Sequence, residues 1–185
     1  YIGFIFYSKS KRFVSNKEAK AINSVVPGNI KKVGVFVNEL MPDIVKRINL
    51  FGLEFVQLHG DEPVEYCLEL NSIGVKIIKS FGIDESFDFN KLEEYQCCCD
   101  YLLFDTKSPA YGGTGQKFNW QKLSEYAFSR PVFLSGGIGP NDSRAIKKLT
   151  NENIFAVDLN SKFEIEPALK DTMLLEKFIK EIRNI

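Results

Sequence analysis

Short apolar runs alternate with amphipathic stretches along the chain, one such unit roughly every 20–30 residues. Continuous apolar runs of this length predict strands that are buried on both faces. Seven strands are predicted, at residues 2–7, 32–38, 55–59, 75–81, 101–105, 131–134 and 154–158. Because strands that alternate with helices are typical of parallel sheets, the pattern predicts an α/β fold.

Seven helical patterns separate and follow these strands. Asn16 is a candidate N-cap for the first, and Pro42 suits the first turn of the second. The helices are expected from residue 16, from 41 to 51, and at 62–71, 90–96, 119–128, 142–149 and 170–183.

The strand at 101–105 delivers Asp105 to its C-terminal end, where parallel α/β proteins carry their chemistry. A long connection to Asn119 follows, and its glycines Gly112, Gly113 and Gly115 predict a lid that closes over a ligand. A loop without function is the alternative.

Two other strand ends predict a phosphate site. Gly136 and Gly137 follow the strand at 131–134, and Asn160 and Ser161 follow the strand at 154–158. Barrels commonly hold phosphate on backbone N–H groups after their last two strands. The alternative is that the glycine pair only forms a tight turn.

Composition narrows the class of protein. Lysine plus arginine and aspartate plus glutamate number 24 each, so the formal net charge is zero and favours neither nucleic acid nor an anionic membrane as a partner. No run is long enough to span a bilayer, and none reads as a signal peptide, so a cytoplasmic location is expected. The 185 residues predict one domain, short of the about 250 that a complete (β/α)₈ barrel takes.

Four cysteines, Cys67, Cys97, Cys98 and Cys99, form neither a disulfide framework nor, with one histidine in the chain, a zinc-ligand spacing. We expect buried or half-buried free thiols, with Cys67 as a small core residue. No metal site is predicted.

Motifs at successive strand ends carry a resemblance to a known family. They are Val56 to Glu62, Tyr101 to Lys107 with the Gly-rich segment after it, Leu134 to Ile138, Val157 to Ser161, and Lys170-Asp171. In this order they resemble phosphoribosylanthranilate isomerase, a tryptophan-pathway enzyme built on a TIM barrel. The resemblance implies one barrel domain at 1–185 with strands 2 to 8 of the family barrel. The family's first strand, with its Lys-Ile-Cys-Gly motif, does not occur here, and we expect a longer biological chain upstream.

The resemblance implies an Amadori rearrangement of N-(5-phosphoribosyl)anthranilate to 1-(2-carboxyphenylamino)-1-deoxyribulose 5-phosphate, without cofactor or metal. Asp105 is then the general acid that protonates the furanose ring oxygen, which requires a pKa raised by burial or by a neighbouring anion. We expect the apolar surroundings of Phe104 and its neighbours to raise it. Taken alone, Asp105 could equally be a helix cap or a partner for Lys107. The family's general base is the cysteine of the first strand, so these 185 residues by themselves are expected to be nearly inactive.

The resemblance also implies substrate contacts. Arg12 matches an arginine that binds the anthranilate carboxylate, with a solvated basic loop as the alternative. His59 and Asp158 match pocket residues, and a structural histidine and a structural network are their alternatives. Lys162 stands where the family commonly has a glycine, which puts one phosphate contact in doubt but could supply charge.

Two other functions stay open on the sequence. One is an inactive, truncated barrel that only binds a phosphorylated small molecule. The other is a different phosphate-binding barrel enzyme such as indole-3-glycerol-phosphate synthase, whose strand-end lysine and glutamate are not evident. A monomer and a homodimer are both compatible with the sequence.

Overall fold

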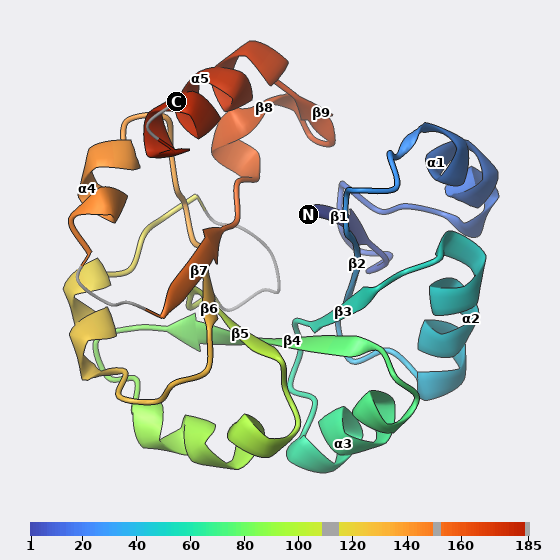
Figure 1. Ribbon diagram of the computed structural model, residues 1–185, viewed down its shortest axis with the longest axis horizontal. Helices are drawn as coiled ribbons and strands as arrows, with labels where there is room; N and C mark the ends of the chain where they lie inside the picture. Colours follow the sequence, from blue (N-terminus) through green and yellow to red (C-terminus); the bar gives the residue numbers. More distant parts are fainter. Residues whose placement is uncertain (109–114, 150–152, 184–185) are drawn as a thin grey trace. The chain divides into compact units, whose positions relative to one another are not determined.

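The computed structural model describes residues 1–108, 115–149 and 153–183 (Figure 1). Within them, the seven predicted strands are all present and follow one another in the sheet in chain order. The pairs β1–β2, β2–β3, β3–β4 and β6–β7 are parallel, as predicted. The strands are β1 (Ile2–Ile5), β2 (Lys32–Phe36), β3 (Phe55–Leu58), β4 (Lys76–Ile83), β5 (Tyr101–Thr106), β6 (Val132–Leu134) and β7 (Ile154–Val157).

Five of the predicted helices are α-helical at least in part, and two are 3₁₀ helices. The α-helices are α1 (Ala19–Val25), α2 (Met41–Phe51), α3 (Val64–Ser72), α4 (Ser143–Lys147) and α5 (Thr172–Arg183). The stretches at 90–96 and 119–128 are instead the 3₁₀ helices η2 (Phe89–Cys97) and η3 (Trp120–Glu125). Asp88 and Asn119 precede these stretches, and their side-chain oxygens accept backbone N–H groups two residues on. Residues three apart share a face in a 3₁₀ helix as well as in an α-helix, so the sequence pattern does not separate the two.

The first helix begins differently from the prediction. Ser15, not Asn16, is the N-cap of the short 3₁₀ helix η1 (Asn16–Glu18), which leads into α1. The Ser15 amide donates to Glu18 Oε2 at 2.6 Å, so a Ser-x-x-Glu capping box fixes the start one residue earlier. The prediction of Asn16 as the cap is therefore wrong.

A short hairpin was not predicted. After the 3₁₀ helix η4 (Ser161–Phe163), β8 (Glu164–Glu166) pairs antiparallel with β9 (Leu169–Lys170). The final helix then starts at Thr172, because Asp171 Oδ1 accepts the amide of Leu174 and caps it. Helical periodicity in 170–183 does not locate this cap.

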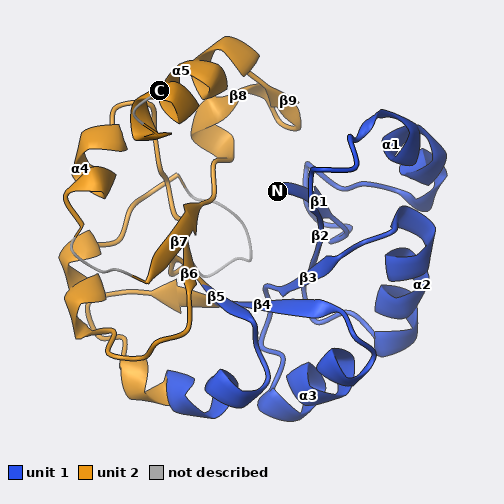
Figure 2. Ribbon diagram, in the orientation of Figure 1, with its two compact units in different colours: residues 1–80, 92–102 blue, residues 81–91, 103–185 orange. Residues whose placement is uncertain are grey.

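The chain forms two compact units, shown in different colours in Figure 2. The first comprises residues 1–80 and 92–102, and the second comprises residues 81–91 and 103–185. In the first unit, Phe6 stacks on Phe36 and packs edge-on against Phe51, and all three are buried. In the second unit, Phe163 packs against Phe178. Each unit therefore has its own aromatic core.

Candidate active site

Asp105 occupies the penultimate position of β5, as the sequence predicts. The three residues before it are buried, and the ring of Phe104 packs against Phe89 and Tyr126 at centroid distances of 5.5 and 5.2 Å. Burial raises the pKa of the Asp105 carboxyl, and a hydrogen bond of 2.7 Å from the Thr106 amide to Oδ1 offsets part of that effect. The predicted direction and cause of the pKa shift are confirmed.

The alternative partner for Asp105 is engaged elsewhere. Lys107 forms an ion pair of 2.5 Å with Asp84, at the end of β4, and its backbone amide donates to Ile83. The Lys107 ammonium therefore neutralises a different carboxylate. Its pairing also holds the pKa of Asp84 below the usual range.

Thr106 connects Asp105 to the end of the Gly-rich segment. Its hydroxyl donates to the Gln116 carbonyl at 2.8 Å and accepts from the Phe118 amide at 3.1 Å. Gly115 takes a left-handed conformation with φ of 70° just before this tether. Gly112 and Gly113 lie outside the described residues, and the lid role of the three glycines stays a prediction.

Gly136 and Gly137 both have left-handed backbones, with φ of 90° and 62°. A Cβ atom on Gly136 would lie 2.5 Å from Thr106 Oγ1 and 3.1 Å from Asp105 Oδ1. A Cβ atom on Gly137 would lie 2.4 Å from the Gln116 carbonyl oxygen. Glycine is required at both positions, so that this loop can approach β5 and the tethered segment.

Asp158 follows β7 and is hydrogen-bonded within the same unit. Ser135 Oγ donates to Asp158 Oδ2 at 3.0 Å, and the Asp158 amide donates to the Leu134 carbonyl at 2.8 Å. The Ser135 amide in turn donates to the Phe104 carbonyl at 2.8 Å, so the ends of β5, β6 and β7 are in register. This register places Asp105, Ser135 and Asp158 along one edge of the strands.

The loop after β7 carries Asn160 and Ser161 into η4. Asn160 Oδ1 accepts from Lys170 at 2.6 Å, and Lys170 also pairs with Glu164 at 3.0 Å. The exposed Lys162 extends past Gly139 to Gly115. A Cβ atom added to Gly115 would lie 3.3 Å from Lys162 Cε. The ammonium therefore lies beside the Gly-rich segment, while the Cβ and Cγ atoms of the same side chain lie beside the loop after β6.

Three residues that the sequence analysis did not select hold these loops. They are Thr106, described above, and the pair formed by Lys117 and Asp142. Lys117 Nζ lies 2.6 Å from Asp142 Oδ1, while the Gly139 amide donates to Asp142 Oδ2 at 2.6 Å. Asp142 was expected only at the start of a helix. Nothing in the local sequence indicates this second role, because the ion pair joins Asp142 to a residue 25 positions away.

The two candidate substrate-binding residues of the first unit, Arg12 and His59, follow two different strands. Arg12 is half-buried in the loop after β1, and its amide donates to Ser10 Oγ at 3.1 Å. His59 follows β3, with Nδ1 2.9 Å from the amide nitrogen of Gln57. Because an amide nitrogen donates, Nδ1 accepts in this contact and Nε2 carries the proton of the neutral ring.

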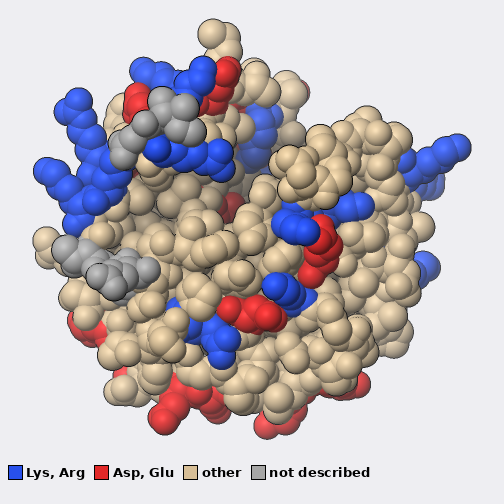
Figure 3. All heavy atoms as spheres, in the orientation of Figure 1, with Lys and Arg blue, Asp and Glu red and all other residues tan. Residues whose placement is uncertain are grey.

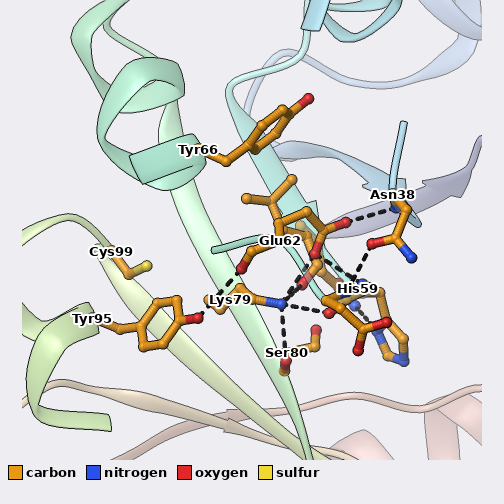
Figure 4. Close-up of polar contacts among 12 residues, drawn as sticks. Asn38, His59, Glu62, Tyr66, Lys79, Ser80, Tyr95 and Cys99 are labelled. Atoms are coloured by element: carbon orange, nitrogen blue, oxygen red, sulfur yellow. Dashed lines mark hydrogen bonds and ion pairs between the residues drawn. The ribbon is translucent and has the colours of Figure 1, made fainter. Parts of the chain in front are cut away.

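A buried ion pair lies near His59 in the first unit (Figure 4). Lys79 Nζ is 3.0 Å from Glu62 Oε2 and donates to the Gly60 carbonyl at 2.7 Å. Glu62 also accepts the amides of Asn38 at 2.8 Å and Gly60 at 3.0 Å. Gly60 must be glycine, because a Cβ atom there would lie 2.2 Å from Asn38 Oδ1. These contacts explain the His-Gly-Asp-Glu motif as a structural junction of β2, β3 and β4.

A hollow lies elsewhere in the second unit. Its volume is about 320 Å³, and residues of α4 and α5 line it, among them Ser143, Arg144 and Lys177. None of the predicted site residues lines this hollow. Figure 3 shows basic side chains gathered over α4, where Arg144 and Lys147 lie in its last turn. Across the described ranges, no helix combines the length and apolar character that crossing a membrane requires.

Comparison with known proteins gives consistent results. The family model for N-(5'-phosphoribosyl)anthranilate isomerase matches residues 1–181. The isomerase of Parabacteroides distasonis is 42% identical over 186 aligned residues, covering 98% of this chain and 83% of that protein. The isomerase of Thermotoga neapolitana is also 42% identical, covering 100% of this chain and 88% of the relative.

Solved structures of this enzyme have the same fold. Phosphoribosyl anthranilate isomerase from Thermotoga maritima is 37% identical with a TM-score of 0.86, covering 99% of this chain and 87% of that one. A second isomerase structure, in complex with reduced 1-(o-carboxyphenylamino)-1-deoxyribulose 5-phosphate, is 33% identical with a TM-score of 0.84, at 99% and 87% coverage. The predicted α/β fold of the TIM-barrel type is confirmed. On the family match and these relatives, the chain belongs to the N-(5'-phosphoribosyl)anthranilate isomerase family.

Proposed function

We propose that this protein catalyses the Amadori rearrangement of N-(5-phosphoribosyl)anthranilate to 1-(2-carboxyphenylamino)-1-deoxyribulose 5-phosphate in tryptophan biosynthesis. One observation carries the residue-level proposal: a carboxyl at the end of β5 whose pKa is raised by burial, with the glycine loop against it. A raised pKa keeps more of the acid form available near neutral pH, which general-acid catalysis needs.

Asp105 acts in this proposal on the substrate's furanose ring oxygen. Proton donation from Oδ lets the ring C–O bond open, and the nitrogen lone pair of the anthranilate amine assists to give an iminium. Removal of the C2 proton by a base then gives the enamine that becomes the ketose. The family's base is a cysteine on a strand that is not among these 185 residues, so Asp105 is the one proton-transfer group assigned here.

The phosphate is proposed to bind at Gly136, Gly137, Asn160 and Ser161. The left-handed glycines turn the chain sharply, a geometry that can present successive backbone amides to an anion. Lys162 supports the proposal, because it directly follows Ser161 and its ammonium, which lies beside Gly115, supplies positive charge. The Asn160 side-chain oxygen is already bonded to Lys170, so its contribution is assigned to the backbone or to the amide nitrogen.

The remaining substrate contacts are proposed from the family resemblance. Arg12 is assigned to the anthranilate carboxylate, since a guanidinium fork suits a carboxylate. His59 and Asp158 are assigned to the pocket wall, and the hydrogen bond from Ser135 fixes one oxygen of Asp158. The glycines at 112, 113 and 115 are proposed as lid hinges.

Residues 1–185 are proposed to act as one barrel domain in the cytoplasm, with a phosphorylated small molecule as the partner. A single cooperative unfolding transition would support the single domain, and two separate transitions would contradict it. A related structure is described as monomers generated from the dimeric Thermotoga maritima enzyme. Sedimentation will decide between a monomer and a homodimer here.

The direct test is Asp105→Asn in the full-length protein. Loss of the general acid is expected to lower turnover by about 10²–10⁴ while binding of the reduced product analogue stays within a few fold. Turnover is followed by substrate fluorescence, and binding by calorimetry. The matched control is Asp88→Asn, which removes an exposed carboxylate from the same unit and is expected to leave turnover unchanged.

The outcomes separate the two functions. Turnover retained in Asp105→Asn would remove the assignment of the acid. Tight binding of the analogue without any turnover in the unmodified full-length protein would favour the alternative, a barrel that only binds a phosphorylated ligand.

A further inference from the structure

Three cysteine sulfurs meet inside the first unit. The Sγ atoms of Cys67, Cys98 and Cys99 all lie within 4.8 Å of one another, and those of Cys98 and Cys99 are 3.7 Å apart. Cys67 comes from α3, and the other two come from the segment between η2 and β5. We call these three residues the thiol cluster. All three are at most 2% exposed, so the cluster lies in the core.

The closeness of the three sulfur atoms cannot be predicted from the sequence, because Cys67 and Cys98 are far apart along the chain. The fourth cysteine, Cys97, adjoins the cluster at the end of η2 but is exposed, and its Sγ donates to the Glu94 carbonyl. Its exposure is a correction to the expectation that all four thiols are at least half-buried. Every cysteine of the chain is therefore in the cluster or next to it.

The sulfur separations suit a shared metal ion. Metal–thiolate bonds of about 2.3 Å place sulfurs about 4.0 Å apart in a trigonal site, and about 3.8 Å apart in a tetrahedral one. A disulfide requires about 2.05 Å instead. With separations between 3.7 and 4.8 Å, the cluster needs only small side-chain rotations to close on one ion.

The donor set indicates which ion. Among the described residues, the grouping contains sulfur only, and the one histidine of the chain, His59, contacts Gln57 through Nδ1. Structural zinc takes four ligands, whereas soft sulfur donors favour Cu(I), which three sulfurs satisfy in a trigonal plane. Three sulfurs without nitrogen or oxygen therefore match a monovalent thiophilic ion better than zinc.

The thiol cluster lies near the buried ion pair of Lys79 and Glu62 and next to an exposed cysteine. Figure 4 shows Cys99 beside Tyr95, whose hydroxyl points toward Glu62 and its partner Lys79. Exposed Cys97, adjacent to Cys98, offers an incoming ion a first sulfur at the surface, and ligand exchange can then carry it inward.

We propose that the thiol cluster binds one Cu(I) ion through the sulfurs of Cys67, Cys98 and Cys99, with release of their protons. The ion links α3 to the segment that leads into β5. It takes no part in the isomerisation, because the cluster precedes the N-terminal end of β5 and Asp105 lies near the other end of that strand. The site is independent of the proposed function.

The test uses the full-length protein, reduced and free of oxygen, with Cu(I) supplied as its acetonitrile complex. In competition with a chromogenic Cu(I) chelator we expect one ion bound per chain. X-ray absorption is expected to show a shell of three sulfurs. Failure to compete with the chelator, or a shell of two sulfurs, would overturn the proposal.

Serine variants locate the ion. Cys67→Ser, Cys98→Ser and Cys99→Ser are each expected to weaken Cu(I) binding at least tenfold, whereas Cys97→Ser is the matched control that retains it. If Cys97→Ser lost Cu(I) binding while Cys67→Ser retained it, the ion would be bound by Cys97 and Cys98 near the surface. That result would contradict the proposal. Circular dichroism checks that each variant folds. If the variants at the buried positions do not fold, X-ray absorption of the folded Cys97→Ser protein still tests the proposal. The proposal requires a shell of three sulfurs in that variant.

Discussion

Two carboxyl groups that follow or end strands, one buried and one half-buried, have opposite surroundings. Glu62, 4% exposed, accepts from Lys79 and from two backbone amides. Asp105 follows a buried apolar run, and burial has the larger effect on it, raising the pKa of its carboxyl. The first carboxylate is surrounded by donors, whereas burial lets the second retain its proton to a higher pH.

The difference separates a structural group from a chemical one. A carboxylate already bonded to an ammonium has no proton to give and is costly to disturb. A carboxyl that burial keeps protonated can donate that proton. When it ionises, the unfolding free energy of the protein falls. Both effects can be measured as unfolding free energies.

The largest effect is expected from breaking the ion pair. Lys79→Met leaves the Glu62 carboxylate buried without its ammonium and is expected to lower the unfolding free energy by about 3–5 kcal/mol. Urea denaturation at neutral pH measures the change. The matched control is Lys31→Met, which breaks an exposed pair with Glu54 and should cost at most about 1 kcal/mol.

A double-mutant cycle with Glu62→Gln sharpens this result. If the pair is coupled, the double variant loses less than the sum of the single losses, because no buried charge is left alone. Additive losses would mean that Lys79 and Glu62 stabilise the protein separately, through their backbone contacts.

These two carboxyls also show what the sequence can predict. Asp105 was predictable with its burial, because the residues that surround it precede it in one apolar run. The partner of Glu62 was not, since Lys79 lies 17 residues away and inside an apolar strand, where its charge has no local signal. The pattern likewise predicts the strands well, but not the 3₁₀ geometry of η2 and η3, because residues three apart share a face in both kinds of helix.

The thiol cluster follows the same rule at longer range. Cys98 and Cys99 are neighbours in sequence, but only the packing of α3 brings Cys67 to them. Spacing rules for metal ligands recognise local patterns and so do not detect it. Contacts between distant segments are what the structure adds.

Asp105→Asn is expected to stabilise the protein at neutral pH. Because the folded pKa lies above the unfolded value of about 3.9, the folded state binds more protons between the two values. The wild type therefore loses stability as pH rises through that window, by about 1.4 kcal/mol for each unit between the two pKa values, and asparagine does not. Denaturation of both proteins from pH 3.5 to pH 8 measures the difference, which should vanish at the acid end. A constant difference across that range would show that Asp105 has an ordinary pKa.

Asp158 gives the smallest and most discriminating effect, because a neutral hydroxyl bonds its carboxylate. Ser135→Ala removes that donor and is expected to cost about 0.5–1.5 kcal/mol of unfolding free energy. If Asp158 only supports the fold, turnover of the full-length protein should stay unchanged under conditions where the variant is fully folded. If Asp158 lines the substrate pocket, loss of this hydrogen bond loosens its carboxylate, and KM rises while the unfolding free energy falls by the same small amount. Steady-state kinetics beside urea denaturation, with Ser124→Ala as an exposed hydroxyl control, distinguish the two roles.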